Sequence, residues 1–300
     1  MKSSHIEIDW SHLGKEISNA TAEPFILVEQ HALGGGCINS AYQVTDGERR
    51  YFIKFNDASK IEMFAAETEA LRALQDTATV RVPEPICWGV TGDAAYIVIE
   101  YLEFGRSNDI SAAALGERLA LLHQHTGKRY GWHRDNTIGS TPQINTADSD
   151  WLTFWRERRL NFQLRLAEQH GFDGRLLRKG EQLANSLALI LADHQPAPSL
   201  LHGDLWSGNH ATLRDGTPVI FDPASYYGDR ETDLAMTELF GGFSPRFYAA
   251  YKDRFPLEDG YQLRKTLYNL YHILNHANLF GGGYAAQAEH MIDTLLSEVA

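Results

Sequence analysis

A short polar loop followed by a second acidic turn is the feature that most constrains this 300-residue chain. The loop, Leu200 to His210, reads LLHGDLWSGNH and carries Asp204 and Asn209 five positions apart. Asp222 comes thirteen residues after Asn209, directly behind the apolar run Val219–Phe221, which predicts a strand ending at that carboxylate. An Asp can accept a proton, and carboxylate and amide oxygens are the ligands that hard divalent cations prefer. The two turns therefore predict a site that combines a base with a metal ion.

The same separation of Asp and Asn occurs in protein kinases, in the motif H-R-D-x-x-x-x-N, where a later Asp-Phe-Gly supplies another metal ligand. Here Gly203 stands in place of the Arg. Asp and Asn are common turn residues, so an isolated His-Gly-Asp is weak evidence, but the full string with a correctly spaced Asp is much more specific. This pattern makes Asp204 the candidate catalytic base and makes Asn209 and Asp222 the candidate ligands of Mg²⁺.

A glycine-rich hairpin is predicted near the N-terminus. It joins a strand that starts at Phe25–Val28 and runs to Leu33 to a second strand at Ala41–Val44, through Gly34, Gly35 and Gly36. A dinucleotide-binding fingerprint would place a helix after the glycines, and a Walker loop would need a Lys that is absent there. The hairpin therefore indicates a flap whose backbone approaches phosphates, with an ordinary glycine turn as the alternative.

Lys54 lies inside the next apolar strand, Arg50–Phe55. In a kinase-like sheet, a Lys at this place binds the α and β phosphates of ATP and pairs with a Glu on the following helix. The predicted helix, Ser59–Thr77, offers two candidates. Glu67 borders its apolar face whereas Glu69 points further away, so Glu67 is the predicted partner; the alternative is that both glutamates are solvated.

A domain boundary is predicted near Leu102. The apolar strand Ala95–Ile99 runs into Glu100, Tyr101 and Leu102, where a kinase binds adenine through its backbone. We therefore expect an N-terminal nucleotide-binding lobe over 1–101 and a helical catalytic and substrate lobe over 102–300. Helices of the second lobe are predicted at 111–125, 149–170, 173–194, 245–254, 260–280 and 284–299, with a loop at 127–143.

Charge and cysteine content exclude several classes of protein. The net charge is −12 and no basic block is present, which argues against nucleic acid and anionic membranes as partners. No apolar run approaches the roughly 18 residues of a membrane span. Two cysteines are too few for a disulfide scaffold and favour a reducing, cytoplasmic compartment. One of them, Cys37, lies in the predicted flap and is a candidate redox-active thiol, with an inert small residue as the alternative.

Three further features leave alternatives open. Trp206 either contacts a sugar or a cationic amine with its flat face or packs under the loop. Asp233 either caps the helix that follows it or braces the backbone of the catalytic loop. His272 and His276 are four residues apart on one predicted helix, but no third zinc ligand is evident and a structural role is favoured.

Taken together, the motifs resemble those of the fructosamine-3-kinase (ketosamine-3-kinase) family. That family lies within the kinase-like superfamily that includes aminoglycoside phosphotransferases and choline kinases. The stretches that carry the resemblance are HGDLWSGN at 202–209, FDPA at 221–224 and YGDRETDLA at 227–235. The resemblance implies an α+β, protein-kinase-like bilobal fold, with an antiparallel sheet plus helix in the small N-terminal lobe and a larger, mainly helical C-terminal lobe.

The resemblance also implies a function. It is the ATP- and Mg²⁺-dependent phosphorylation of a sugar hydroxyl, O-3, on a ketosamine such as a fructosamine or ribulosamine adduct, carried by a small amine or a protein. The phosphorylated adduct is unstable and releases the amine, so the biological role would be deglycation. Asp229, Arg230 and Asp233, with Trp206, are the candidate substrate residues.

Two other functions remain open at this point. One is a kinase of another small alcohol, such as an aminoglycoside or a choline-like compound. The other is a non-catalytic pseudokinase that serves as a binding module, against which the intact Lys54, Asp204, Asn209 and Asp222 argue. A monomer or a weak homodimer is expected.

Overall fold

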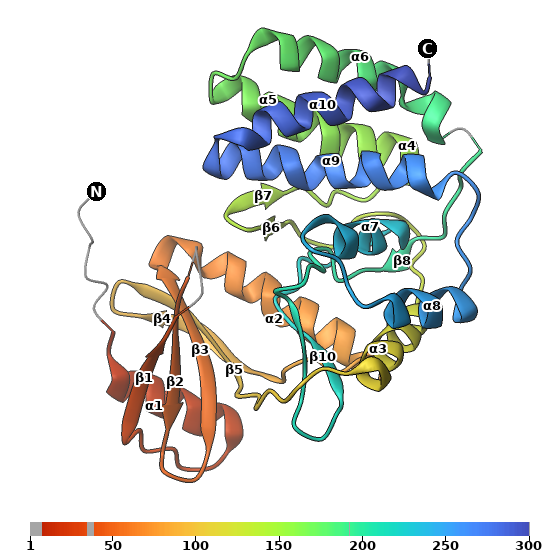
Figure 1. Ribbon diagram of the computed structural model, residues 1–300. Coiled ribbons are helices and arrows are strands. Elements are labelled where there is room, and N and C mark those ends of the chain that lie inside the picture. Colours follow the sequence, from red (N-terminus) through yellow and green to blue (C-terminus); the bar gives the residue numbers. More distant parts are fainter. Residues whose placement is uncertain (1–7, 35–38, 192, 300) are drawn as a thin grey trace. The chain divides into compact units, whose positions relative to one another are not determined.

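The protein divides into two compact units in the computed structural model, which describes residues 8–34, 39–191 and 193–299 (Figure 1). The first unit comprises Met1–Ser107 and Ala211–Asp222, and the second comprises Asn108–His210 and Pro223–Ala300. The chain therefore returns to the first unit for twelve residues after the loop that carries Asp204. In the described ranges, no helix has the length and apolar character needed to cross a membrane.

A five-stranded antiparallel sheet forms the first unit, in the order β1-β2-β3-β5-β4 (Figure 1). Its strands are β1 (Glu29–Leu33), β2 (Ser40–Thr45), β3 (Arg50–Asp57), β4 (Pro85–Thr91) and β5 (Ala94–Glu100). Its helices are α1 (Trp10–Thr21) and α2 (Ile61–Asp76), the second preceded by the 3₁₀ turn Ala58–Lys60. The predicted hairpin is present, since β1 and β2 pair from Glu29 opposite Thr45 to Leu33 opposite Ala41.

The predicted strand is present, but its predicted start at Phe25 is wrong, because β1 begins at Glu29. Phe25 is buried in the cluster between α1 and the sheet, and its backbone N–H donates to the Ser18 hydroxyl of α1 at 2.8 Å. This segment is thus held by the helix before the chain reaches the sheet.

Alternation along β3 decides which side chain faces which helix. Ile53 and Phe55 belong to the apolar cluster that includes Leu13 and Ile17 of α1. Successive side chains of a strand point to opposite faces. Lys54 therefore points to the other face of the sheet, and it meets Glu67 of α2 there.

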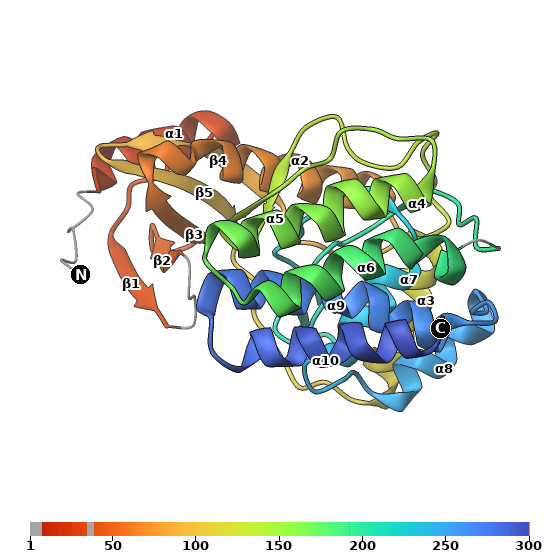
Figure 2. The same ribbon diagram turned by 90° about the horizontal axis from the view of Figure 1, so that it is seen from above.

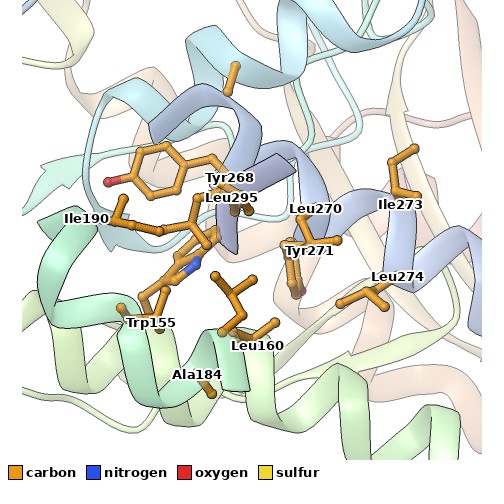
Figure 3. Packing of buried hydrophobic residues seen from close by; sticks show 14 of the residues in the cluster. Trp155, Leu160, Ala184, Ile190, Tyr268, Leu270, Tyr271, Ile273, Leu274 and Leu295 are labelled. Carbon is orange, nitrogen blue, oxygen red and sulfur yellow. The ribbon is translucent and has the colours of Figure 1, made fainter. Parts of the chain in front are cut away.

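The second unit is mainly helical. Its helices are α3 (Asp109–Leu122), α4 (Trp151–Phe154), α5 (Asn161–Gln169), α6 (Gly174–Leu191), α7 (Glu231–Leu239), α8 (Pro245–Arg254), α9 (Tyr261–Phe280) and α10 (Gly283–Ser297). A π-helical stretch, Trp155–Leu160, joins α4 to α5. Helices α5, α6, α9 and α10 pack side by side (Figure 2). Figure 3 shows their apolar core, where Tyr268 and Tyr271 of α9 lie beside Trp155.

Short strands fix the irregular parts of the chain. The segment predicted as a loop at 127–143 contains the hairpin β6 (Asn136–Ile138) and β7 (Thr141–Gln143), so that prediction is partly wrong. Strands β8 (Ser199–Leu200) and β11 (Tyr227–Gly228) pair in the second unit, and β9 (His210–Thr212) pairs with β10 (Pro218–Ile220). The predicted α+β class, an antiparallel sheet with helices followed by a mainly helical part, is confirmed.

Candidate active site

A buried lysine ammonium forms the charged centre of the first unit. Nζ of Lys54 donates to Oε1 of Glu67 at 2.7 Å and to Oδ1 of Asp222 at 2.6 Å. The Lys54 residue is only 6 % exposed. The ion pair between Lys54 and Glu67 predicted from the sequence is confirmed, whereas the contact between Lys54 and Asp222 was not foreseen.

The electrostatics of this cluster favour a charged lysine. Burial lowers the pKa of Lys54, but the carboxylates of Asp222 and Glu67 more than offset this, and the pKa lies above its usual range. The side chain of Asp222 remains 44 % exposed, so it retains accessible surface beyond the oxygen bound by Lys54. Its φ of 59° is rare for a residue other than glycine and indicates a strained turn.

A cavity of about 460 Å³ lies within the first unit, beside this cluster. Its lining includes Asp222 and the backbone segment Tyr101–Leu102 that follows β5. Phe104 stacks on Phe221 at 5.6 Å between ring centroids, and both rings line the cavity. The cavity therefore has flat apolar walls near the Lys54 ammonium group, which is bound to Asp222. A volume of this size suits a nucleotide-sized ligand.

The predicted nucleotide residues are placed as follows. Glu100, Tyr101 and Leu102 all line the cavity, and the carboxylate of Glu100 is engaged by the guanidinium of Arg81 and by the backbone N–H of Glu84. Leu33, which precedes Gly34, lines the cavity. Gly35, Gly36 and Cys37 lie outside the described residues, and the predictions made for them remain predictions.

The loop Leu200–His210, which carries the candidate base Asp204, belongs to the second unit and is held by hydrogen bonds between its own residues. Nδ2 of Asn209 donates to the carbonyl of Asp204 at 2.8 Å and to its carboxylate at 3.3 Å. The amide of Asn209 is thereby oriented with its nitrogen toward Asp204, which leaves its carbonyl oxygen as the group able to meet a cation. Carboxylate and amide oxygens together fit the ligand preferences of Mg²⁺, so the chemistry of Asn209 and Asp222 suits this metal.

Gly203 makes the loop possible. Its φ of 84° belongs to the left-handed region, and a Cβ there would overlap the carbonyl oxygen of Ala224. The N–H of Ala224 in turn donates to the carbonyl of His202 at 2.9 Å. Glycine is therefore required where protein kinases carry an arginine in the corresponding motif.

Asp233 braces the loop, which decides between the two roles predicted for it. Its carboxylate accepts the backbone N–H of His202 at 2.7 Å and that of Gly203 at 2.8 Å, and it also meets Nε2 of His123 at 3.1 Å. Burial raises the pKa of Asp233, but the hydrogen bond and charge of His123 outweigh this effect, and the pKa lies below its usual value. A buried carboxylate thus sets the backbone that leads into Asp204.

Comparisons with known proteins decide the family. The model of the fructosamine kinase family matches residues 9–298. The chain belongs to the fructosamine kinase family. It is 50% identical over 288 residues to the "Probable ketoamine kinase" of Synechocystis sp., covering 96% of this chain and 97% of the relative. It is 44% identical over 268 residues to the chloroplastic "Protein-ribulosamine 3-kinase" of Arabidopsis thaliana, covering 88% and 82%.

Structural similarity agrees with this assignment. The crystal structure of a "Putative fructosamine-3-kinase" from Haemophilus somnus matches with a TM-score of 0.88 and 29% identity, covering 96% of this chain and 97% of that one. The predicted family and the kinase-like fold are both confirmed.

The family-specific segment after β11 is buried. Asp229 and Arg230 are 1 % and 6 % exposed, and both have internal partners. Asp229 accepts from Tyr268 at 2.6 Å and meets Nε2 of His194 at 2.6 Å, while Arg230 lies over the ring of Phe255. We therefore assign Asp229, Arg230 and Asp233 a structural role in place of the predicted substrate contact.

The acidic residues around His194 do not need a metal ion. His194, Asp229 and Glu231 bring ligand atoms within reach of one another. Glu231, however, accepts hydrogen bonds from Nε of Arg264 at 2.7 Å and from its Nη2 at 2.9 Å, and His194 is held between Asp229 and Glu258. For the second histidine pair, Nδ1 of His276 donates to the carbonyl of His272 at 2.8 Å, in keeping with the structural role predicted.

Sequence reasoning missed His123 and Gln143. Nδ1 of His123 meets the hydroxyl of Tyr251 at 2.7 Å, so His123 links α8 to Asp233. Its position four residues after Leu119 places it on the buried face of α3, and a polar residue on an apolar face was the available signal. Nε2 of Gln143 donates to the carbonyl of Ala224 at 3.0 Å. Ala224 in turn donates to His202 of the loop that carries Asp204, so Gln143 supports that loop indirectly.

Asp233→Asn should uncouple the loop from its support. An amide keeps one acceptor but turns an N–H toward one of the two backbone N–H groups, which costs about 1–3 kcal/mol of stability. We expect kcat to fall at least tenfold while KM for ATP changes less than twofold, as measured by steady-state kinetics. Asp253→Asn, an exposed change on α8, is the control. A folded Asp233→Asn protein with unchanged kcat would contradict the bracing role.

His194→Gln should change how stability depends on pH. Burial lowers the pKa of His194, but the carboxylate of Asp229 outweighs this and the pKa is raised. A raised pKa stabilises the fold fully below the unfolded value of about 6.5, and this contribution is lost as the pH rises through the folded pKa. Melting temperatures measured between pH 5.5 and 9 should therefore differ between wild type and variant most at acidic pH. The exposed His290→Gln should show no such trend, and a pH-independent difference for His194→Gln would refute the assignment.

Proposed function

We propose that this protein transfers the γ-phosphoryl group of ATP to the O-3 hydroxyl of the sugar in a ketosamine, such as a fructosamine or ribulosamine adduct. The observation that carries this proposal is the buried Lys54, paired with Glu67 and Asp222 beside a cavity of about 460 Å³. In kinase-like folds this is the arrangement that fixes nucleotide phosphates. The relatives named ketoamine kinase and ribulosamine 3-kinase support the acceptor and its position.

In this proposal the first unit binds the nucleotide. The backbone of Tyr101 and Leu102 receives the adenine, and the flap that begins at Gly34 covers the phosphates. Lys54, oriented by Glu67, neutralises the charge of the α and β phosphates. The phosphoryl group does little covalent chemistry with the protein, so positioning and charge neutralisation supply most of the rate.

The catalytic loop supplies the base. Asp204 accepts the proton of the attacking hydroxyl, and Asn209 holds the Asp204 carboxylate through its amide nitrogen. Asn209 and Asp222 are the residues that would hold Mg²⁺, an assignment that rests on their oxygen chemistry and spacing in the chain. When bound, the metal ion neutralises charge on the β and γ phosphates.

The product determines the biological role. A ketosamine phosphorylated at O-3 is unstable and breaks down to release the free amine, so the proposed role is deglycation of amines or proteins in the cytoplasm. The competing function is phosphorylation of another small alcohol. A panel of a fructosamine, a ribulosamine, choline and an aminoglycoside, assayed by ADP release, separates the two, and turnover of choline or the aminoglycoside alone would overturn the proposal.

Asp204→Asn should abolish most of the turnover without disturbing nucleotide binding. A general base of this kind contributes about 10²–10⁴-fold to the rate, so kcat should fall by that factor. Calorimetric titration with ATP and Mg²⁺ should give a Kd within about twofold of wild type. Asp253→Asn is again the matched control. Turnover at the wild-type rate in Asp204→Asn would refute the assignment and would favour a different base.

Trp206→Leu should weaken substrate binding selectively. The indole is 38 % exposed, and a Leu cannot offer the flat π-face that attracts a sugar or an ammonium group. KM for the ketosamine should rise several-fold more than KM for ATP. Trp88→Leu, at a tryptophan of similar exposure on β4 of the first unit, is the control. Equal changes in both KM values would instead indicate that Trp206 only supports the loop.

A further inference from the structure

A chain of aromatic rings leads from the catalytic loop to the end of α9. The ring of Trp206 meets Phe240 edge-on at 6.3 Å between centroids, and Phe240 lies 4.9 Å from the ring of His276. His276 is followed by Phe280 at 5.7 Å and Tyr284 at 5.1 Å. We call these five residues the aromatic strip. All of them belong to the second unit.

The backbone leaves this strip partly uncovered. Phe240 follows α7 and Phe280 ends α9, and each is followed by two glycines with positive φ, Gly241–Gly242 and Gly281–Gly282. Phe280 is 55 % exposed, and Phe240, His276 and Tyr284 are partly exposed. Adjacent aromatic rings with exposed surface offer an apolar face to which a ligand can bind.

The loop fixes the first ring of the strip. A side chain at residue 208 would overlap the six-membered ring of Trp206, so Gly208 makes room for the indole. The Ser207 hydroxyl donates to the carbonyl of Phe240 at 3.1 Å, which ties the loop to the end of α7. The strip is thus attached to the segment that carries Asp204, two residues before Trp206.

His276 adds a polar group of defined orientation. Its Nδ1 carries a proton, because it donates to the carbonyl of His272. Burial lowers the pKa of His276, so the ring is neutral near pH 7 and its Nε2 is an acceptor. Within the described parts of the chain, Nε2 of His276 has no hydrogen-bond partner.

We propose that the aromatic strip binds the amine carrier of the ketosamine, with Nε2 of His276 accepting a hydrogen bond from the substrate ammonium group. This inference rests on the proposed function. The sugar hydroxyl must reach Asp204, and the amine is bonded to the first carbon of the same sugar, so the carrier leaves the catalytic loop at Trp206. A ketosamine nitrogen is a secondary amine, protonated at neutral pH, and such a cation is attracted to aromatic faces.

The chemistry of the strip predicts which carriers bind well. Phe280 and Tyr284 offer apolar surface to an aliphatic chain, such as the methylene groups of a lysine side chain, and burial of each methylene group favours binding. A carrier of one carbon ends before these rings. The length of the carrier should therefore affect binding only through Phe280 and Tyr284, the rings furthest from the loop.

Two fructosamines with the same sugar test this inference, one made on methylamine and one on hexylamine. The probe variants are Phe280→Ala combined with Tyr284→Ala, and separately His276→Asn, whose amide retains a donor to the His272 carbonyl but removes Nε2. For the double variant, kcat/KM should fall at least tenfold more with the hexylamine adduct than with the methylamine adduct. For His276→Asn, KM should rise with both adducts and kcat should change little. Leu189→Ala, at an exposed residue on α6, is the control.

The outcomes separate the two proposals. No turnover of either adduct by the wild-type protein overturns the proposed function, and this inference with it. Turnover by the wild type with an unchanged preference between adducts in the double variant overturns the inference alone. A lower melting temperature of the double variant would indicate a packing role, and the KM values of His276→Asn relative to wild type then decide. An unchanged KM for both adducts overturns the inference, and a raised KM for both supports it.

Discussion

The charge of one lysine governs how the first unit is assembled. Moving an ammonium group out of water costs several kcal/mol unless carboxylates compensate the charge. This cost is comparable to the whole free energy of unfolding of a domain. Lys54 obtains one carboxylate from α2 and the other from Asp222, 168 residues further along the chain. The segment Ala211–Asp222 therefore belongs with the sheet, where Val219 bridges to Arg81 and the carbonyl of Thr212 accepts from Gly105.

The second unit uses a buried charge in the same way. Asp233 is 1 % exposed and is satisfied by two consecutive backbone N–H groups and by His123. The backbone N–H groups of His202 and Gly203 have no rotamers of their own, so their hydrogen bonds to Asp233 hold the backbone before Asp204 in one conformation. A catalytic side chain gains most of its rate advantage from such prior positioning. In both units, the buried ion is supported by several partners and lies beside a residue to which the proposed mechanism gives a role, Asp222 in the first unit and Asp204 in the second.

What the sequence predicted well follows from local geometry. The pairing of Lys54 with Glu67 could be predicted because strand alternation and helix periodicity each select one residue. The contacts that were missed depend on long-range packing: Lys54 with Asp222, and His123 with Asp233, 110 residues apart. The start of the first strand was placed too early for a related reason. Phe25 is apolar and buried, but its backbone N–H donates to Ser18 of α1 and not to a neighbouring strand.

The five-residue spacing between Asp204 and Asn209 is used for two purposes. In the proposed mechanism its two ends carry out the chemistry, and the Asn209 amide nitrogen donates to the Asp204 carboxylate at 3.3 Å, which ties the two ends of the loop together. Between them, Leu205 is buried, whereas Trp206, Ser207 and Gly208 are exposed. Trp206 and Ser207 both contact Phe240 of the second unit. A change of residue type in the middle of the loop can therefore alter which acceptor is recognised without altering the distance between the base and its amide partner. This separation explains how one phosphoryl-transfer loop serves kinases with different acceptors.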